Sequence, residues 1–344
     1  MLLISFSRKC RVSRKATSGA DDPRTRPHGK FDVKGSSGVK IHALFPGQGS
    51  QVPGMGRSLA RAYPEADACF DEASRVLGTD MRTLCWSAAP QVLAATENTQ
   101  PALLTVAVAA WRAARSQGVE PTSAAGHSVG ALAALVAAER LDFAAALRLA
   151  ALRGRLMASA PGQGAMVAVM AHSERKRIDA LMTAGRHDLD LAGDNSPRQL
   201  VFSGEAPKVD RFVSELGASA QKLRVSHAFH SRLMRPVAER WEEAVAQAPL
   251  VDGTVPVGLI STGRYNTDTG QIRSDLYEAL CAPVRWRELM QALLAEDFGP
   301  ALVGFGPAKA LNGMLRHLPD APKVIAADTQ VGIESLTSSV GAAA

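Results

Sequence analysis

The sequence predicts an α/β fold with a mainly parallel sheet and a smaller α+β subdomain inserted into it. Two strand-like runs end in glycine-rich turns and are followed by helical segments, which is the order of elements in a parallel sheet. From residue 163 to residue 226, short strand-like runs alternate with two charged helices instead. The chain of 344 residues is 46% hydrophobic and 21% charged, so it can bury a large core.

The first half of the predicted core alternates strands with helices. The run "VKIHALF" at 39–45 is a predicted strand, and the loop "PGQGSQVPGMG" ends it. Residues 57–118 are predicted to be mostly helical, with breaks near "GTDM" and "SAAP". A second strand runs into "TSAAGHSVG", and "VGALAALVAAERL" continues as a helix. Asp142 is the predicted N-cap of the next helix, of about 16 residues.

The inserted segment has the element order of a ferredoxin-like subdomain. Its predicted strands are "MVAVMA", "LDLAG", "QLVFSG" and "QKLRVS", with helices near 173–184 and 206–217. After His230 the chain returns to longer helices and to the strands "VPVGLIS" and "ALVGFG". We therefore expect a core formed by 39–162 and 227–330 around a subdomain formed by 163–226.

The positive charge of the chain is concentrated at its N-terminus. Residues 1–40 hold ten Lys and Arg against three Asp, which leaves the rest of the chain close to neutral within the net charge of +6. We expect 1–38 to be a disordered basic tail, either a targeting segment or an over-extended start, and 331–344 to be a flexible C-terminus. The rest of the chain predicts no basic field for nucleic acid and no apolar run that would span a membrane.

The cysteines predict a reducing compartment. Cys10, Cys69, Cys85 and Cys281 lie far apart and form no C-x-x-C pair. This spacing indicates neither a disulfide framework nor a zinc site. We expect a cytoplasmic protein without a metal centre.

The pentapeptide "GHSVG" makes Ser128 a candidate nucleophile. If Ser128 ends a strand and opens a helix, a Cβ at Gly126 or Gly130 would clash within the sharp turn. The hydroxyl would then lie exposed above the sheet, and the N–H of Val129 would point toward an oxyanion. The alternative is a serine that only caps a helix. The strand–turn–helix context favours the nucleophile.

A serine at its ordinary pKa needs a base, and the sequence offers more than one. "VSHAFHS" places His227 and His230 at the end of a strand-like run, and spacing does not choose between them. His127 directly precedes Ser128, but neighbouring side chains on such a turn diverge. His127 is therefore a weak candidate for the base.

Arg153 is a candidate for binding a carboxylate. It lies in "AALRGRLM", on a helix that is otherwise apolar on one face. One interpretation is a solvated arginine like Arg148 or Arg155. The other is a guanidinium that projects into a pocket, where its planar fork would bind a substrate carboxylate.

The loop "FPGQGSQ" at 45–51 does not predict nucleotide binding. It lacks the lysine of a phosphate-binding loop and the third glycine of a dinucleotide-binding turn. A glycine-rich turn can instead supply a backbone N–H to an oxyanion, and Gln48 is the natural position for it.

Taken in order, these segments resemble the malonyl-CoA:acyl-carrier-protein transacylases and the acyltransferase domains of polyketide synthases. The resemblance runs from about Val39 to about residue 330. It rests on "FPGQGSQ", "NTQPALL", "GHSVG", "LRGRLM", "GQGAM", "DNSPRQLVFSG", "VSHAFHSRLM", "APVRW" and "GFGPAKAL".

The resemblance implies a hydrolase-like α/β core with a ferredoxin-like insert and a ping-pong mechanism. Ser128 would carry the acyl group as an ester, and His230 would be its general base and acid, oriented by backbone carbonyls instead of a carboxylate. Arg153 would bind the malonyl carboxylate. The N–H groups of Gln48 and Val129 would form the oxyanion hole.

Three further residues are placed at the substrate pocket by the resemblance: Asn195, His127 and Phe229. "HAFH" resembles polyketide acyltransferases that select malonyl units, whereas methylmalonyl-selective relatives tend toward Tyr-Ala-Ser-His. Phe229 would crowd an α-methyl group, and one methyl is worth about 1–3 kcal/mol of discrimination.

The expected activity is transfer of malonyl from malonyl-CoA to the phosphopantetheine thiol of an acyl carrier protein. The chain holds no ketosynthase or carrier sequence, so we expect it to act in trans, in polyketide or fatty-acid synthesis, with "HAFH" favouring the former. The alternatives are the malonyl-transfer subunit of a malonate decarboxylase, a serine acyl hydrolase acting on carrier proteins, and an inactive carrier-docking module. Arg153 argues against the hydrolase, and its presence with Ser128 and His230 argues against the inactive module.

The resemblance implies no metal and no bound cofactor. The expected partners are malonyl-CoA and an acyl carrier protein, with no nucleic acid and no membrane. We expect a monomer.

Overall fold

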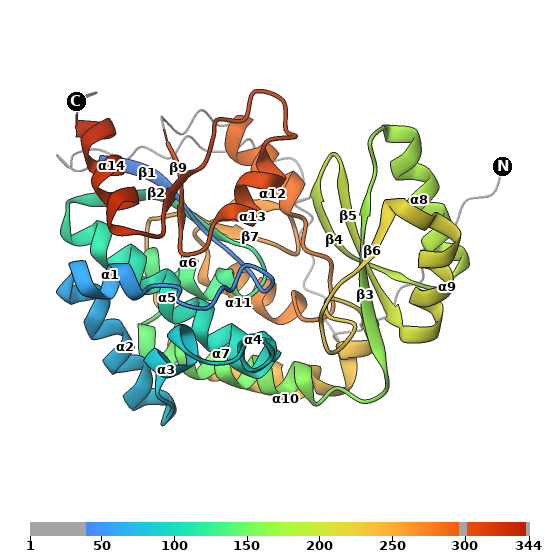
Figure 1. The fold of residues 1–344 in the computed structure, drawn as a ribbon, viewed down its shortest axis with the longest axis horizontal. Helices are drawn as coiled ribbons and strands as arrows, with labels where there is room; N and C mark the ends of the chain where they lie inside the picture. The colour runs from blue at the N-terminus through green and yellow to red at the C-terminus, as the bar shows by residue number, and fades with distance from the viewer. Residues whose placement is uncertain (1–38, 296–300, 342–344) are drawn as a thin grey trace, which may run out of the picture. The chain divides into compact units, whose positions relative to one another are not determined.

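The computed structural model describes residues 39–295 and 301–341 (Figure 1). The basic tail expected at 1–38 lies outside the described residues. The main sheet has the strand order β10-β9-β1-β2-β7-β8, in which all neighbours are parallel except β7 and β8. Its strands are β1 (Val39–Phe45), β2 (Val119–Gly126), β7 (Val257–Leu259), β8 (Arg264–Asn266), β9 (Leu302–Phe305) and β10 (Ile325–Ala327). The predicted parallel sheet is confirmed, with one antiparallel edge.

Helices cover both faces of this sheet. Those before the second sheet are α1 (Arg57–Ala62), α2 (Pro64–Leu77), α3 (Met81–Trp86), α4 (Pro90–Ala94), α5 (Thr96–Ser116), α6 (Gly130–Ala137) and α7 (Phe143–Ala158). Those after it are the 3-10 turn η2 (Arg232–Met234), α10 (Arg235–Gln247), α11 (Thr269–Glu278), α12 (Trp286–Ala295), α13 (Lys309–Leu315) and α14 (Gln330–Gly341). Asp142 caps α7 as predicted, because its side chain accepts a hydrogen bond from the Ala145 N–H at 2.8 Å.

The alternation of side chains along β1 explains the layers. Ile41, Ala43 and Phe45 belong to the core cluster that includes α5, α6 and α7. Leu44 belongs to the cluster that includes α12 and α13. Successive side chains of a strand point to opposite faces, so β1 is buried on both sides.

The ends of β1 and β2 bring the two predicted loops together. Phe45 pairs with Gly126, and the carbonyl of Phe45 accepts a hydrogen bond from the His127 N–H at 2.9 Å. A Cβ on Gly47 would lie 2.5 Å from the His127 carbonyl oxygen, so only glycine fits there. The glycine-rich loop and the serine turn therefore meet at the carboxyl edge of the sheet, where ligands bind in such folds.

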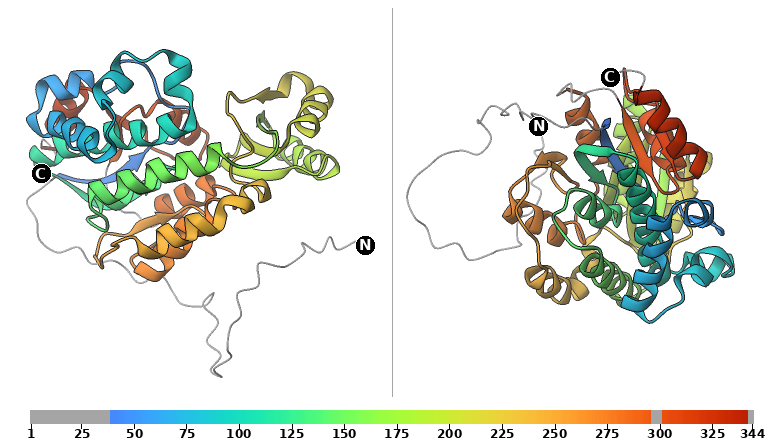
Figure 2. Two further views of the ribbon diagram at one scale, coloured as in Figure 1. Left: turned by 90° about the horizontal axis from the view of Figure 1, so that it is seen from below. Right: turned by 90° about the vertical axis from the view of Figure 1, so that its left-hand side faces the viewer.

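The second sheet is antiparallel, with the order β4-β5-β3-β6. Its elements are β3 (Gly164–Met170), α8 (Glu174–Arg186), β4 (Asp190–Ser196), β5 (Gln199–Glu205), α9 (Ala206–Leu216), the 3-10 turn η1 (Gly217–Ser219) and β6 (Ala220–Lys222). This topology is ferredoxin-like, as predicted. The helix α7, green in Figure 2, leads into this small subdomain, and α10 leads out of it and packs against α7.

The expectation of a flexible C-terminus at 331–344 is wrong for the residues that the structure describes. There α14 packs on the core, with Ile333 and Leu336 fully buried. These two apolar side chains are three residues apart and so share one helix face. The sequence around them is polar and small, which hid the helix. β8 and β10 were also missed, because three residues carry no readable alternation.

Candidate active site

Ser128 lies on a sharp turn between β2 and α6. Its φ is 55°, in the left-handed region of backbone conformation that residues other than glycine rarely adopt. A Cβ on Gly126 would lie 1.9 Å from the Gly130 carbonyl carbon, and one on Gly130 would lie 2.4 Å from the Phe45 oxygen. The two glycines of "GHSVG" are therefore required by the backbone, and the hydroxyl of Ser128 faces a cavity.

His230 is the partner of Ser128. The Ser128 Oγ lies 2.7 Å from Nε2 of His230, and Nδ1 of His230 lies 2.7 Å from the Ala279 carbonyl oxygen. A carbonyl can only accept, so Nδ1 carries the proton and Nε2 is free to accept from the serine. His230 also has a positive φ, of 56°. Strain at both members of the pair is a common mark of a functional site.

The choice between the two histidines that the sequence left open is settled by their contacts. His227 Nδ1 accepts a hydrogen bond from the Ala228 N–H at 2.8 Å, and its Nε2 lies 3.2 Å from the Pro161 carbonyl. Both ring nitrogens of His227 are engaged away from Ser128. Of these two histidines, only His230 is placed to accept a proton from Ser128.

The end of α11 takes the place that a carboxylate holds in many serine sites. Ala279, whose carbonyl orients His230, is the C-cap of α11, and the negative end of a helix dipole favours a cationic ring there. The buried Asp275 in turn ties α11 to the end of β7. Its carboxylate accepts from the Ser261 N–H at 2.7 Å, the Ser261 hydroxyl at 2.6 Å and the Ile260 N–H at 3.2 Å.

His230 is held in its neutral form. Burial, the Arg153 cation and His127 together lower the pKa of His230 to about 3, in spite of the bond to Ala279. A neutral imidazole is the form that can take a proton from Ser128.

Arg153 is buried beside the nucleophile. Its Nη1 donates to Gln100 Oε1 at 3.0 Å, and its Nη2 lies 3.4 Å from the Ser128 Oγ. Burial lowers the pKa of Arg153 to about 10, and within the described residues no carboxylate forms an ion pair with it. Arg148 and Arg155 on the same helix are exposed. The interpretation of Arg153 as a solvated arginine is therefore wrong.

The loop after β1 lines the same cavity as Ser128. Gln48 occupies the β-turn closed by the Ser50 N–H and the Gly47 carbonyl, and its side chain accepts from the Thr96 hydroxyl at 2.7 Å. Val129 directly precedes α6. Neither amide, of Gln48 or of Val129, donates a hydrogen bond to another part of the described chain. Both N–H groups can therefore serve an oxyanion.

The side chain of His127 bonds to Asn195 and, within the described residues, to neither Ser128 nor His230. Asn195 Nδ2 donates to Gln199 Oε1 at 3.0 Å, so its Oδ1 faces Nε2 of His127 at 2.9 Å and accepts from it. The ring of His127 also packs edge-on against Trp286, with centroids 5.5 Å apart. Burial lowers its pKa. His127 is thus a neutral part of the pocket wall and not a base.

The cavity in front of Ser128 has a volume of about 950 Å³ and is mostly apolar. Phe229 lines it, and its carbonyl accepts from the Ser203 hydroxyl of β5 at 2.6 Å. Of the residues expected at the site, the following line this cavity: Gln48, His127, Ser128, Asn195, Phe229 and His230. Val129 and Arg153 are not among them, although Nη2 of Arg153 lies 3.4 Å from the Ser128 Oγ.

The sequence model of the acyl transferase domain matches residues 43–304. The chain belongs to the acyl transferase domain family. It is 37% identical to the malonyl CoA-acyl carrier protein transacylase of Bacillus subtilis, over 86% of this chain and 95% of that one.

Two solved structures resemble this acyl transferase. The FabD of Acinetobacter baumannii matches with a TM-score of 0.82 and 34% identity, over 90% of this chain and all of that one. PlMCAT, a malonyl-transacylase in complex with its type II PKS acyl-carrier protein AntF, matches with a TM-score of 0.81 and 32% identity, over 87% and 99% of the two chains. The resemblance inferred from the motifs is confirmed.

The structure adds residues that sequence reasoning missed. Gln100 lies within the quoted motif "NTQPALL", but the sequence assigned it no role. Ala279 and Asp275 gave no signal, because a backbone carbonyl carries no residue type and one aspartate in a polar helix is ordinary.

The structure describes residues 39–295 and 301–341. No three His, Cys, Asp or Glu side chains gather there into a group that could hold a metal ion. Across the same ranges, no helix combines the length and the apolar character needed to cross a membrane.

The lowered pKa of His230 predicts acid-tolerant acylation. The base acts when neutral, so its activity is lost only as pH falls through its pKa of about 3. We expect the rate of Ser128 acylation by p-nitrophenyl acetate to stay level between pH 8 and about 5, whereas an ordinary histidine would lose half its activity near pH 6.5. Circular dichroism at each pH controls for unfolding. A midpoint near 6.5 would contradict this prediction.

Asp275→Asn is expected to misdirect His230 through α11. If the altered geometry of the Ser128–His230 pair raises the activation free energy by about 1.4 kcal/mol, acylation of Ser128 slows about tenfold. Glu278→Gln is the matched control, since Glu278 is exposed on the same helix. The rate is divided by the concentration of active sites, titrated with a fluorophosphonate, so that unfolded enzyme does not lower the measured value. Equal rates in the two variants would show that Asp275 has no role in orienting the pair.

Proposed function

We propose that this acyl transferase moves a malonyl group from malonyl-CoA to the phosphopantetheine thiol of an acyl carrier protein, through an ester on Ser128. The name of the Bacillus subtilis relative states this activity, and the PlMCAT structure pairs a malonyl-transacylase with its carrier protein.

The observation that carries the proposal is the buried cation of Arg153, 3.4 Å from the nucleophile and without an acidic partner in the described chain. A buried charge is costly unless it is paired. The free carboxylate of a malonyl thioester would supply the missing partner, with the two-pronged geometry that a guanidinium binds best. An acetyl group would leave the charge unpaired.

In the first half-reaction, Ser128 attacks the thioester carbonyl while its proton passes to Nε2 of His230. The new oxyanion would accept hydrogen bonds from the N–H groups of Gln48 and Val129. When the carbonyl reforms, the C–S bond breaks and His230 returns its proton to the leaving thiolate of CoA. Malonyl remains as an ester on Ser128.

The second half-reaction runs the same steps in reverse with a new thiol. The phosphopantetheine thiol of the carrier protein gives its proton to His230 and attacks the ester. The tetrahedral intermediate collapses, the C–O bond breaks, and Ser128 regains its proton from His230. Every step uses side chains of this chain, so the proposal requires neither a metal ion nor a bound cofactor.

The alternatives are less well supported. A hydrolase acting on carrier proteins has little use for a carboxylate clamp at Arg153. A malonate decarboxylase subunit would use the same residues, but the Bacillus subtilis relative and PlMCAT are named as transacylases. The PlMCAT pair belongs to polyketide synthesis, which agrees with "HAFH", and fatty-acid synthesis is the other setting.

A cytoplasmic location is part of the proposal. Cys69 and Cys85 are buried as free thiols, which fits a reducing compartment. In the cytoplasm the enzyme would have access to malonyl-CoA and to carrier proteins.

Loss of Arg153 is expected to remove selection for malonyl. Malonyl-CoA, methylmalonyl-CoA and acetyl-CoA are offered in competition, and the acyl-enzyme is read by intact mass, malonyl adding about 86 Da through the covalent step. Arg153→Met should lower kcat/KM for malonyl-CoA about 10- to 100-fold, the worth of hydrogen bonds to a charged group. Arg155→Met, exposed on the same helix, should change nothing.

Ser128→Ala should form no adduct at all, and the malonyl group of the wild type should pass to an added carrier protein faster than to water. No malonyl adduct, or acetyl loaded as well as malonyl, would reject the proposed role of Arg153. Faster loss to water than to carrier would favour the hydrolase.

Phe229 is expected to discriminate against an α-methyl group. Phe229→Leu frees space at the cavity wall and should raise kcat/KM for methylmalonyl-CoA relative to malonyl-CoA about tenfold, within the range for one methyl group. Phe202→Leu removes the same volume from the buried core of the small subdomain without touching the cavity. A shift in both variants alike would refute a specific role for Phe229.

A further inference from the structure

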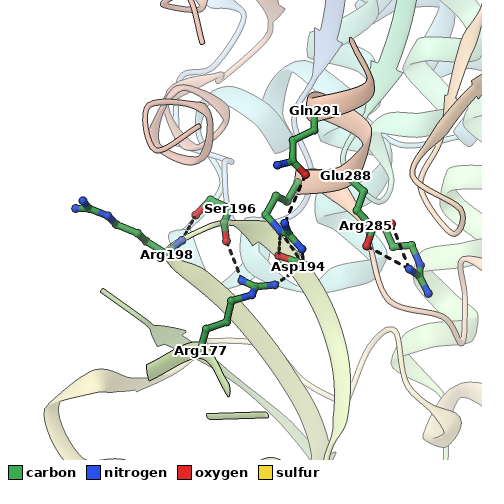
Figure 3. Close-up of polar contacts among 8 residues, drawn as sticks. Arg177, Asp194, Ser196, Arg198, Arg285, Glu288 and Gln291 are labelled. Carbon is green, nitrogen blue, oxygen red and sulfur yellow. Dashed lines mark hydrogen bonds and ion pairs between the residues drawn. The ribbon is translucent and has the colours of Figure 1, made fainter. Parts of the chain in front are cut away.

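An almost buried ion cluster joins the small subdomain to the core (Figure 3). Arg287 donates from Nε to both carboxylate oxygens of Asp194, at 3.1 and 3.0 Å, and its Nη2 lies 2.9 Å from Oδ2. Arg177 donates from Nη2 to the same Oδ2, and from Nη1 to the Ser196 carbonyl at 3.1 Å. The side chains of Arg177 and Asp194 are each 8% exposed. We call these three residues the Arg177–Asp194–Arg287 cluster.

The cluster crosses the boundary between the two sheets. Arg177 lies on α8 and Asp194 on β4 of the small subdomain, whereas Arg287 lies on α12 of the core. The backbone is tied at the same place. The Asp194 N–H donates to the Val284 carbonyl, and the Val284 N–H donates to the Ala192 carbonyl, both at 2.9 Å.

The neighbours of the cluster form the wall of the cavity in front of Ser128. Ala192, Asn195 and Val284 line that cavity. Asn195 follows Asp194 and bonds to His127, and Trp286 precedes Arg287 and packs on the same histidine. A shift of β4 against α12 would therefore move this wall of the cavity. It would also move Asn195 and Trp286, the two residues that contact His127.

Another part of the cavity wall depends on the same sheet. Phe229 is held by the bond from its carbonyl to Ser203 on β5, which pairs with β4. Ser128, in contrast, is held by β2 of the main sheet. The distance between Phe229 and Ser128 thus depends on how the small sheet is held against the core. The α-carbon of a bound acyl group would lie between these two residues.

The charges of the cluster suit a positioning role better than a stabilising one. Two guanidinium cations surround one carboxylate, and all three groups are largely withdrawn from water. Such buried groups often add no net stability, because desolvation offsets their attraction, and their best-attested use is to select one arrangement among several. A bidentate arginine fixes both distance and orientation.

We propose that the Arg177–Asp194–Arg287 cluster sets the width of the acyl pocket, and that its members are positioning residues for discrimination between malonyl and bulkier acyl groups. This inference rests on the malonyl transfer proposed above.

Arg287→Gln is the primary variant, because Asp194 and Arg177 remain paired. Arg287→Lys keeps the positive charge but loses the planar guanidinium that binds both carboxylate oxygens. It is the second variant, used if Arg287→Gln does not fold. Arg285→Gln is the matched control. Arg285 lies two residues away and pairs with Glu288 on the surface, at 3.2 Å with side chains 45% and 40% exposed (Figure 3).

The measurement is the ratio of kcat/KM for malonyl-CoA to that for methylmalonyl-CoA, because the ratio does not depend on the fraction of enzyme that is folded. We expect both Arg287 variants to lower the ratio about threefold or more, part of the range that one methyl group provides. Arg285→Gln should leave it unchanged.

Loading of the wild type with malonyl is measured first, and its absence would reject the proposed function and this inference together. If the wild type loads malonyl, an unchanged ratio in the Arg287 variants would overturn this inference alone. A lower melting temperature with an unchanged ratio would then assign the cluster a purely structural role.

Discussion

The hydrogen bond from Ser128 to Nε2 of His230 is the constraint on which the rest of the site depends. It requires a bare Nε2, which the bond from Nδ1 to the Ala279 carbonyl secures. It also requires a turn so sharp that its flanking positions must be glycine. The two reacting residues stand 102 positions apart in the chain, so the parallel sheet, α11 and the loop after the small subdomain must all be in place before the bond can form.

Three basic groups crowd this site. The cation of Arg153 helps to keep His230 neutral, and burial keeps His127 neutral as well. In the proposed complex the malonyl carboxylate would offset the charge of Arg153, which removes part of the repulsion that lowers the pKa of His230. The base would then bind a proton more readily when the correct substrate is present. Binding and proton transfer would be linked through one arginine.

Features that depend on neighbouring residues could be predicted from the sequence, whereas features that depend on packing between distant segments could not. The Ser128 turn and the Asp142 cap depend on a few neighbouring residues, and both were predicted. The choice of His230 over His227 and the burial of Arg153 depend on packing between distant segments, so spacing left them open. The end of the chain was misjudged because two buried apolar side chains are enough to dock α14. A contact made through backbone atoms leaves no trace in residue type.

A one-way chain of hydrogen bonds connects Arg153 to the loop after β1. Arg153 donates to Gln100, the Gln100 amide donates to Thr96 at 3.1 Å, and the Thr96 hydroxyl donates to Gln48. Each member uses a neutral acceptor, so the chain fixes Arg153 in place without neutralising it. An acid in place of Gln100 would hold the guanidinium as firmly, but it would offset the charge that we propose binds the malonyl carboxylate. Amides and hydroxyls can thus anchor a buried cation while leaving its charge for the ligand.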